Sequence, residues 1–223
     1  MAYDDRRGGD PYGRRGSRAE GSGSRQALQL EADSLPEQAF WFKNAAYVNK
    51  GDYEELMQRS DGSPQLHVDC NGFIFPCNPH PTMERGKIAF NKMQRTWARF
   101  GLHESIVVKP YKIRQGTELG FVKVIVQGLQ GGGSKIEMEH EELEQCFHNV
   151  CRDLVLTPGE IFIAVMPEGT SCAGHPIKMT IEQVSGISYD GSQAPELTRG
   201  VTCSQTVAEF KGSNDIMVLG GGG

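Results

Sequence analysis

The sequence lacks the features that mark membrane and exported proteins. No apolar run among its 223 residues approaches the roughly 18 residues that a membrane-spanning helix needs. Its first residues carry charges but no apolar core, so we expect no secretory signal. The hydrophobic share of 38% and the charged share of 23% are ordinary. The length therefore suits one large globular domain or two small ones.

The cysteines are irregularly spaced. The six cysteines are Cys70, Cys77, Cys146, Cys151, Cys172 and Cys203. These spacings match neither paired C-x-x-C zinc ligands nor the framework of a small disulfide-rich domain. Without an export signal, we expect reduced thiols in the cytoplasm.

Motifs for catalysis are incomplete or absent. Residues 128–135 (G-L-Q-G-G-G-S-K) resemble a phosphate-binding loop, but in that loop lysine directly follows the second glycine, and no Walker B strand follows here. The sequence has no G-x-S-x-G nucleophile elbow. The best thiol–imidazole pair, Cys172 and His175, lies in a loop bounded by Gly and Pro. We therefore expect this chain to have no enzymatic activity and no cofactor.

Charge is distributed unevenly along the chain. Residues 1–26 are rich in Gly, Arg and Ser, and six arginines against four acids give them a net charge of about +2. Such a segment buries too little apolar surface to order itself, so we expect a disordered tail. Its R-R-G-G pieces leave RNA binding open beside a solubilising role. The remainder carries about −7, which does not favour nucleic acid or anionic lipid.

Short apolar runs separated by turn residues dominate residues 27–112. They predict a closed or half-closed β-barrel, with one helical turn near 52–58. The predicted strands are 40–42, 45–48, 65–68, 71–75, 88–90 and 105–109.

Residues 117–217 predict a second subdomain of the α+β class. One strong helix is expected over 137–154, because apolar residues recur there on a single stripe. Cys146 and Cys151 fall on that stripe, so we expect core thiols and not a metal site with His140 and His148. Glycine-rich residues 218–223 predict the start of a linker. The acids expected on the solvated side of the helix are Glu137, Glu139, Glu141, Glu142 and Glu144. The strands expected around it are 119–126, 160–166, 177–184, 201–207 and 215–219.

Residues 86–97 (G-K-I-A-F-N-K-M-Q-R-T-W) are the most informative stretch. The pattern predicts a short apolar strand followed by a polar turn that carries Lys92, Gln94 and Arg95. Trp97 is expected to anchor that turn in the core. Arginine presents five donors in a fixed fork that suits the carboxylates of a partner.

This stretch resembles the N-terminal domain of the N-ethylmaleimide-sensitive factor (NSF) family, AAA+ ATPases that take SNARE complexes apart. The family has a G-x-I-A/G-F strand followed by Q-R-x-W, which correspond to residues 86–90 and 94–97. Residues 44–49 resemble the family's first strand, and residues 52–53 resemble the D-F pair after it. The resemblance spans roughly residues 35–218 and is most specific in the first half.

The resemblance implies a double-psi β-barrel followed by an α/β subdomain. It implies that the domain binds the SNAP adaptor and its SNARE complex in the cytoplasm, at vesicle and Golgi membranes. It also implies a homohexameric parent whose ATPase domains, absent here, use ATP and Mg. Arg95 corresponds to a basic residue that receives the acidic end of the adaptor. The family's paired lysines correspond here to Gly131 and Gly132, and its arginine before the first strand to about Ser34. The other basic residues that could rebuild the site are Lys92, Arg99, Lys87 and Lys135.

Three alternatives stay open at this point. A related N-terminal domain, that of valosin-containing protein, binds cofactors of ubiquitin pathways. The tail leaves room for an RNA-binding protein of the RGG type. A small enzyme with a double-psi barrel, as in aspartate decarboxylase, is disfavoured because no self-processing Gly-Ser pair or acid dyad stands out.

Overall fold

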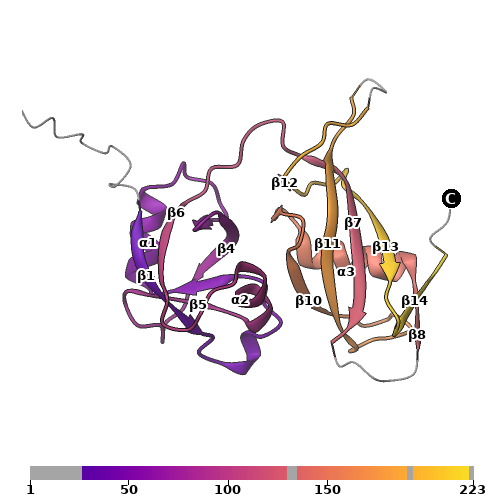
Figure 1. Cartoon of the computed structure of the whole chain (residues 1–223), viewed down its shortest axis with the longest axis horizontal. Helices are drawn as coiled ribbons and strands as arrows, with labels where there is room; N and C mark the ends of the chain where they lie inside the picture. The colour runs from indigo at the N-terminus through magenta and orange to yellow at the C-terminus, as the bar shows by residue number, and fades with distance from the viewer. Residues whose placement is uncertain (1–26, 130–134, 190–192, 221–223) are drawn as a thin grey trace, which may run out of the picture.

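The computed structural model describes residues 27–129, 135–189 and 193–220, which form two lobes side by side (Figure 1). The first lobe is a β-barrel, and the second is a small sheet with one main helix. The mostly-β fold class that the sequence predicted is thereby confirmed. The predicted disordered tail 1–26 and the loop residues 130–134 lie outside the described residues.

Six strands close the barrel of the first lobe. They are β1 (Leu28–Ser34), β2 (Ala46–Val48), β3 (His67–Cys70), β4 (Phe73–Pro79), β5 (Lys87–Phe90) and β6 (Ser105–Pro110). Around the ring the order is β1-β5-β2-β4-β3-β6, so strands from the first half of the lobe alternate with strands from its second half. β1 pairs with β5 and β2 with β4 in parallel, and the remaining pairs are antiparallel. This interleaving is the arrangement expected of a double-psi barrel.

The barrel core is built from alternating strand residues and a cluster of rings. In β6, Ile106 and Val108 are fully buried while Val107 between them faces solvent. The ring of Phe90 lies 5.0 Å from that of Phe75 and 5.4 Å from that of Phe100, measured between centroids. Buried apolar surface contributes about 25 cal/mol per Å², so these large rings supply much of the stability of the lobe.

Three short helical segments cover the barrel: η1 (Gln38–Phe40), α1 (Lys50–Gln58) and α2 (Lys92–Ala98). α1 is longer than the single turn predicted, and its first turn is capped by the Asn49 side chain, which accepts from the Gly51 N–H at 2.8 Å. The predicted strand at 40–42 is wrong, because η1 and a turn occupy that position. β1 was not singled out from the sequence, since its apolar residues merely alternate with polar ones.

The second lobe is a four-stranded sheet of order β10-β11-β7-β13 with two short ladders, β12–β9 and β14–β8. Helix α3 packs on one face of the sheet (Figure 1). Its elements are β7 (Leu119–Gly128), β8 (Ile136–Glu139), α3 (His140–Cys151), β9 (Val155–Leu156), β10 (Ile161–Val165), β11 (Pro176–Gly186), β12 (Gly200–Val201), β13 (Val207–Gly212) and β14 (Ile216–Leu219). The predicted strand 201–207 is wrong, because a turn separates β12 from β13.

Helix α3 buries the predicted apolar stripe. Leu143, Cys146, Phe147 and Cys151 face the sheet and are buried. The helix begins at His140 and not at 137, because the preceding residues form β8 and pair in parallel with β14. Two of the acids expected on the helix therefore lie on a strand. None of the helices in the described ranges has the length and apolar content that crossing a membrane requires.

Candidate functional site

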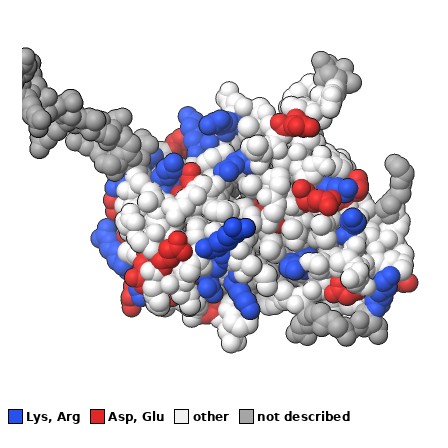
Figure 2. All heavy atoms as spheres, viewed as in Figure 1, with Lys and Arg blue, Asp and Glu red and all other residues white. Residues whose placement is uncertain are grey.

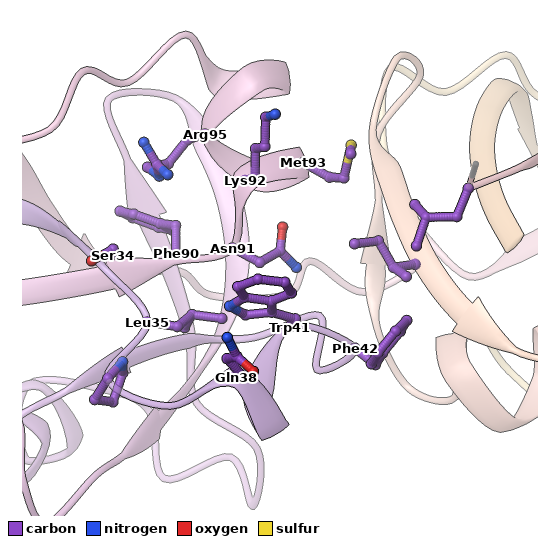
Figure 3. A pocket seen from close by; sticks show the side chains of 13 residues that line it. Ser34, Leu35, Gln38, Trp41, Phe42, Phe90, Asn91, Lys92, Met93 and Arg95 are labelled. Carbon is purple, nitrogen blue, oxygen red and sulfur yellow. The ribbon is translucent and has the colours of Figure 1, made fainter. Parts of the chain in front are cut away.

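A groove of about 540 Å³ lies where the two lobes meet (Figure 3). The barrel lobe supplies most of it, from residues 34–42 and from the end of β5 and the start of α2, and the second lobe adds Leu129 and Ile163. Its size falls within the range of about 300–1,000 Å³ typical of ligand sites. The lining residues are Ser34, Leu35, Pro36, Gln38, Trp41, Phe42, Phe90, Asn91, Lys92, Met93, Arg95, Leu129 and Ile163.

The aromatic side of the groove is set by one anchored ring. The ring of Phe40 packs edge-on against Tyr47 at 4.8 Å and His80 at 4.9 Å, and both of these residues are buried. Three consecutive aromatic residues cannot all face one core, so the next two project outward. Trp41 remains 53% exposed and Phe42 remains 42% exposed, and both line the groove.

The cationic side of the groove is a helix where the sequence predicted a turn. α2 forms because Asn91 and Gln94 make a capping box: the Gln94 N–H donates to Asn91 Oδ1 at 2.8 Å, and the Asn91 N–H donates to Gln94 Oε1 at 2.9 Å. On a helix, residues three apart share a face. Lys92 and Arg95 accordingly both line the groove, with Met93 beside them.

Arg95 has an unmatched donor. Its Nε atom is buried without a hydrogen-bond partner among the described residues. A buried donor left unpaired costs about 1–3 kcal/mol, and such groups in native proteins call for an explanation. Arg95 also lines the groove, where a guanidinium can pair with an acceptor from a partner.

Side-chain amides hold the walls of the groove together. Asn91 Nδ2 donates to the Lys43 carbonyl at 3.3 Å, which links the start of α2 to the aromatic segment. Asn44 bonds the backbone of Ile163 twice: its Nδ2 donates to the carbonyl at 2.8 Å, and its Oδ1 accepts from the N–H at 2.9 Å. Asn44 thus occupies the free edge of β10 as a further strand would. The groove is therefore preformed by contacts on both sides.

Three of the predicted partner-binding cations lie elsewhere. Lys87 is on β5 and is engaged by Glu84 at 2.8 Å and Asp33 at 3.5 Å. Arg99 is exposed and ends α2 in the left-handed conformation, with φ of 59°. Lys135 is exposed and directly precedes β8, a strand that lies on the side of the second lobe away from the barrel (Figure 1). None of these three side chains lines the groove.

The predicted cations Lys92 and Arg95 are the two that come together in the groove. On the face seen in Figure 2, Lys and Arg side chains gather along the junction of the lobes, in the region of α2. Sequence reasoning missed Trp41 and Phe42 as site residues. The sequence signal for them was the run F-W-F followed directly by K-N. Three consecutive aromatic residues beside polar ones cannot all be buried in one core, so some of the rings are exposed.

Trp97 reaches across the junction on the other side of α2. Its ring packs edge-on against Phe73 at 5.0 Å and against Phe75 at 5.4 Å. It also lies against the backbone of Gly159 in the second lobe. Trp97 is partly buried, so it joins the edge of the barrel core to the neighbouring lobe.

A buried carboxyl lies close to this contact. Glu160 is 4% exposed, and its Oε2 accepts from the Thr157 N–H at 3.1 Å. Burial raises the pKa of the Glu160 carboxyl well above its ordinary value, against the smaller opposing effects of that hydrogen bond and of Arg199. Arg199 itself crosses the junction and donates to the Gly72 carbonyl at 3.2 Å.

The cysteines are free thiols. Burial raises the pKa of Cys146 to about 11 and that of Cys151 well above its ordinary value. Cys172 Sγ donates to the Glu137 carbonyl at 3.3 Å. Within the described ranges, no three His, Cys, Asp or Glu side chains converge as metal ligands. Most of the loop that resembles a phosphate-binding motif lies outside the described residues.

The groove thus combines exposed rings, aliphatic side chains and two cations. Among the described residues that line it, none carries a thiol, an imidazole or a carboxylate. Its side chains suit the binding of an apolar group and a carboxylate from a partner. A comparison of the sequence with models of known protein families finds no match.

Proposed function

We propose that the chain is the adaptor-recognition domain of a vesicle-fusing ATPase of the NSF type. It would bind the SNAP adaptor on SNARE complexes at vesicle and Golgi membranes. ATPase domains elsewhere in a homohexameric parent would then use ATP and Mg to pull the complex apart. The proposal draws on the resemblance of residues 86–97 to that family and on the groove beside them.

The observation that carries the proposal is the position of Arg95 in the groove. Its Nε lacks a partner among the described residues, and Lys92 lies one helical turn away on the same side. A guanidinium binds a carboxylate through two parallel hydrogen bonds, and such charge-assisted bonds are roughly twice as strong as neutral ones. An acidic adaptor segment supplies carboxylates for such a pair.

The charge balance of the rest of the chain supports the same choice of partner. Residues beyond the tail carry a net charge of about −7, so most of the surface repels an acidic segment. A local cationic groove on an acidic body directs such a segment to one place, because like charges disfavour the other approaches.

The test is the binding of purified SNAP adaptor to the chain and to Arg95→Glu. We expect the substitution to cost about 2–5 kcal/mol of binding free energy if the pair is desolvated. Wild-type binding should weaken as salt rises, because charges are screened over about 10 Å at 0.1 M, and the variant should show a shallower slope. Calorimetry at low and at physiological salt measures both quantities.

Arg152→Glu is the matched control. Arg152 is exposed at the end of α3 and does not line the groove, so this variant changes the net charge equally. It should retain most of the adaptor affinity. Equal losses in the two variants would mean that overall charge, and not Arg95, governs binding. A wild-type chain that does not bind SNAP would reject the proposed function.

A further inference from the structure

The groove places two different chemistries side by side. Figure 3 shows Lys92, Met93 and Arg95 along one side and Trp41 and Phe42 along the other. A partner made of carboxylates alone would pair with the cations and leave the two rings in water. The two rings therefore indicate an apolar group in the partner, which the cations alone do not.

The two rings lie outside the contacts that anchor their segment. Phe40 already fixes this segment to the barrel, and Trp41 and Phe42 have 53% and 42% of their surfaces exposed. Apolar patches rimmed by polar groups mark interaction sites. Aromatic residues and arginine are also the residues that dominate binding energy at protein interfaces.

We propose that the groove recognises an acidic segment of a protein partner that carries a large aliphatic side chain next to a carboxylate. This inference rests on the proposed function and specifies the chemistry of its partner. The carboxylate pairs with Arg95, and the aliphatic side chain packs between the aromatic pair and Ile163. Met93 adapts its shape to that side chain, because its unbranched thioether is flexible.

One short segment can reach both parts because the walls are tied together. The bond from Asn91 to the Lys43 carbonyl, 3.3 Å long, joins the cationic side to the aromatic side. The two bonds from Asn44 hold Ile163 in place. A preformed groove binds with a smaller loss of conformational freedom. Salt screens only the carboxylate contact, so affinity should persist at salt concentrations that abolish a purely ionic contact.

The test uses three short synthetic peptides and the fluorescence of Trp41. The first peptide is acidic with one central leucine, the second replaces the leucine with serine, and the third replaces the acids with glutamine. The protein carries Trp97→Phe, which leaves Trp41 as its single tryptophan, since the chain has two. We expect the first peptide to shift Trp41 emission to the blue. The other two should bind at least about tenfold more weakly.

Matched variants locate the binding energy. Trp41→Ala should weaken binding of the acidic leucine peptide by about tenfold or more, measured by calorimetry. Tyr189→Ala should leave it unchanged, because Tyr189 is 81% exposed and lies outside the groove. Unaltered affinity in Trp41→Ala, or equal affinity for the leucine and serine peptides, would overturn the inference. So would phosphatidylserine vesicles that shift Trp41 emission when the acidic leucine peptide does not.

The inference and the proposed function can fail separately. If purified SNAP does not bind but the acidic leucine peptide binds through Trp41, the proposed function fails and the inference stands. If SNAP binds through Arg95 while Trp41→Ala keeps full affinity for SNAP and for the peptide, the inference fails and the proposed function stands.

Discussion

The junction between the lobes has a sealed part and an open part. In the sealed part, the Asn44 amide is satisfied by the Ile163 backbone, and Trp97 packs across to Gly159. In the open part, Trp41 is more than half exposed, and Arg95 keeps a buried donor without a partner among the described residues. Both parts lie between residues 159–163 of the second lobe and the region around α2.

This difference separates contacts that stabilise the fold from side chains available for binding. Polar groups in the sealed part find their partners in the other lobe, so replacing them should lower stability. Side chains in the open part make few contacts within the folded chain. Their substitution should therefore change the affinity for a partner and leave the free energy of unfolding nearly unchanged. The two tryptophans, one in each part, offer the sharpest comparison.

Trp97→Ala should have the largest effect on stability. Replacing a buried Trp with Ala costs about 3–5 kcal/mol, and because Trp97 is only partly buried we expect about 3 kcal/mol. Trp41→Ala is the matched control and should unfold at nearly the same urea concentration as the wild type. Equal losses in the two variants would show that the groove rings belong to the core and would remove the distinction.

Asn44→Ala should have the next largest effect. The change leaves both the N–H and the carbonyl of Ile163 without their partner, and a buried group left unsatisfied costs about 1–3 kcal/mol. We expect a loss of about 2 kcal/mol in the free energy of urea unfolding. Asn149→Ala is the control, since Asn149 is exposed on α3. A loss no larger than that of the control would mean that water replaces Asn44 freely.

Glu160→Gln should raise stability near neutral pH. Burial raises the pKa of Glu160 well above its ordinary value of about 4.5, and the charge of Arg199 opposes this shift. Glu160 in turn helps to raise the pKa of Cys151. The folded chain therefore holds this proton more tightly than the unfolded chain. Its stabilising contribution is complete below pH 4.5 and is lost as the pH rises through the pKa of the folded state.

We therefore expect the glutamine variant to be more stable than the wild type at neutral pH, because it carries no carboxyl that must ionise in the folded state. The advantage should disappear as the pH falls below 4.5. Melting temperatures across a pH series measure this convergence. An advantage that stays constant with pH would show that ionisation of Glu160 is not its cause.

The sequence predicted the barrel and the α3 stripe because both rest on local periodicity. The alternation in β6 and the spacing of Leu143, Cys146 and Phe147 are visible without knowing any distant contact. α2 was mistaken for a turn because its capping box depends on Asn91 and Gln94 as a pair, whereas the pattern gave weight to the charged residues Lys92 and Arg95.

The candidate site was predictable only in part, because part of it depends on contacts between residues far apart in the sequence. Arg95 and Lys92 stood out by charge and by resemblance, and both line the groove. The outward direction of Trp41 depends on Phe40 packing against Tyr47 and His80, residues that the sequence does not mark as neighbours. Ile163 enters from the other lobe, 119 positions beyond Asn44. Contacts at that separation follow from the fold and not from any local pattern.

Arg95→Met should have the smallest effect on stability and is the most direct test of the open part. Methionine keeps an unbranched apolar stem against the groove but removes the buried donor that has no partner among the described residues. Removing an unsatisfied buried group relieves a cost instead of creating one, so we expect a change within about 0.5 kcal/mol, the range usual for substitutions away from structural contacts. Urea unfolding measures this change, and Asn44→Ala from the sealed part is the contrasting variant. A loss comparable to that of Asn44→Ala would mean that Arg95 stabilises the folded chain, and the groove would then not have its cation free for a partner.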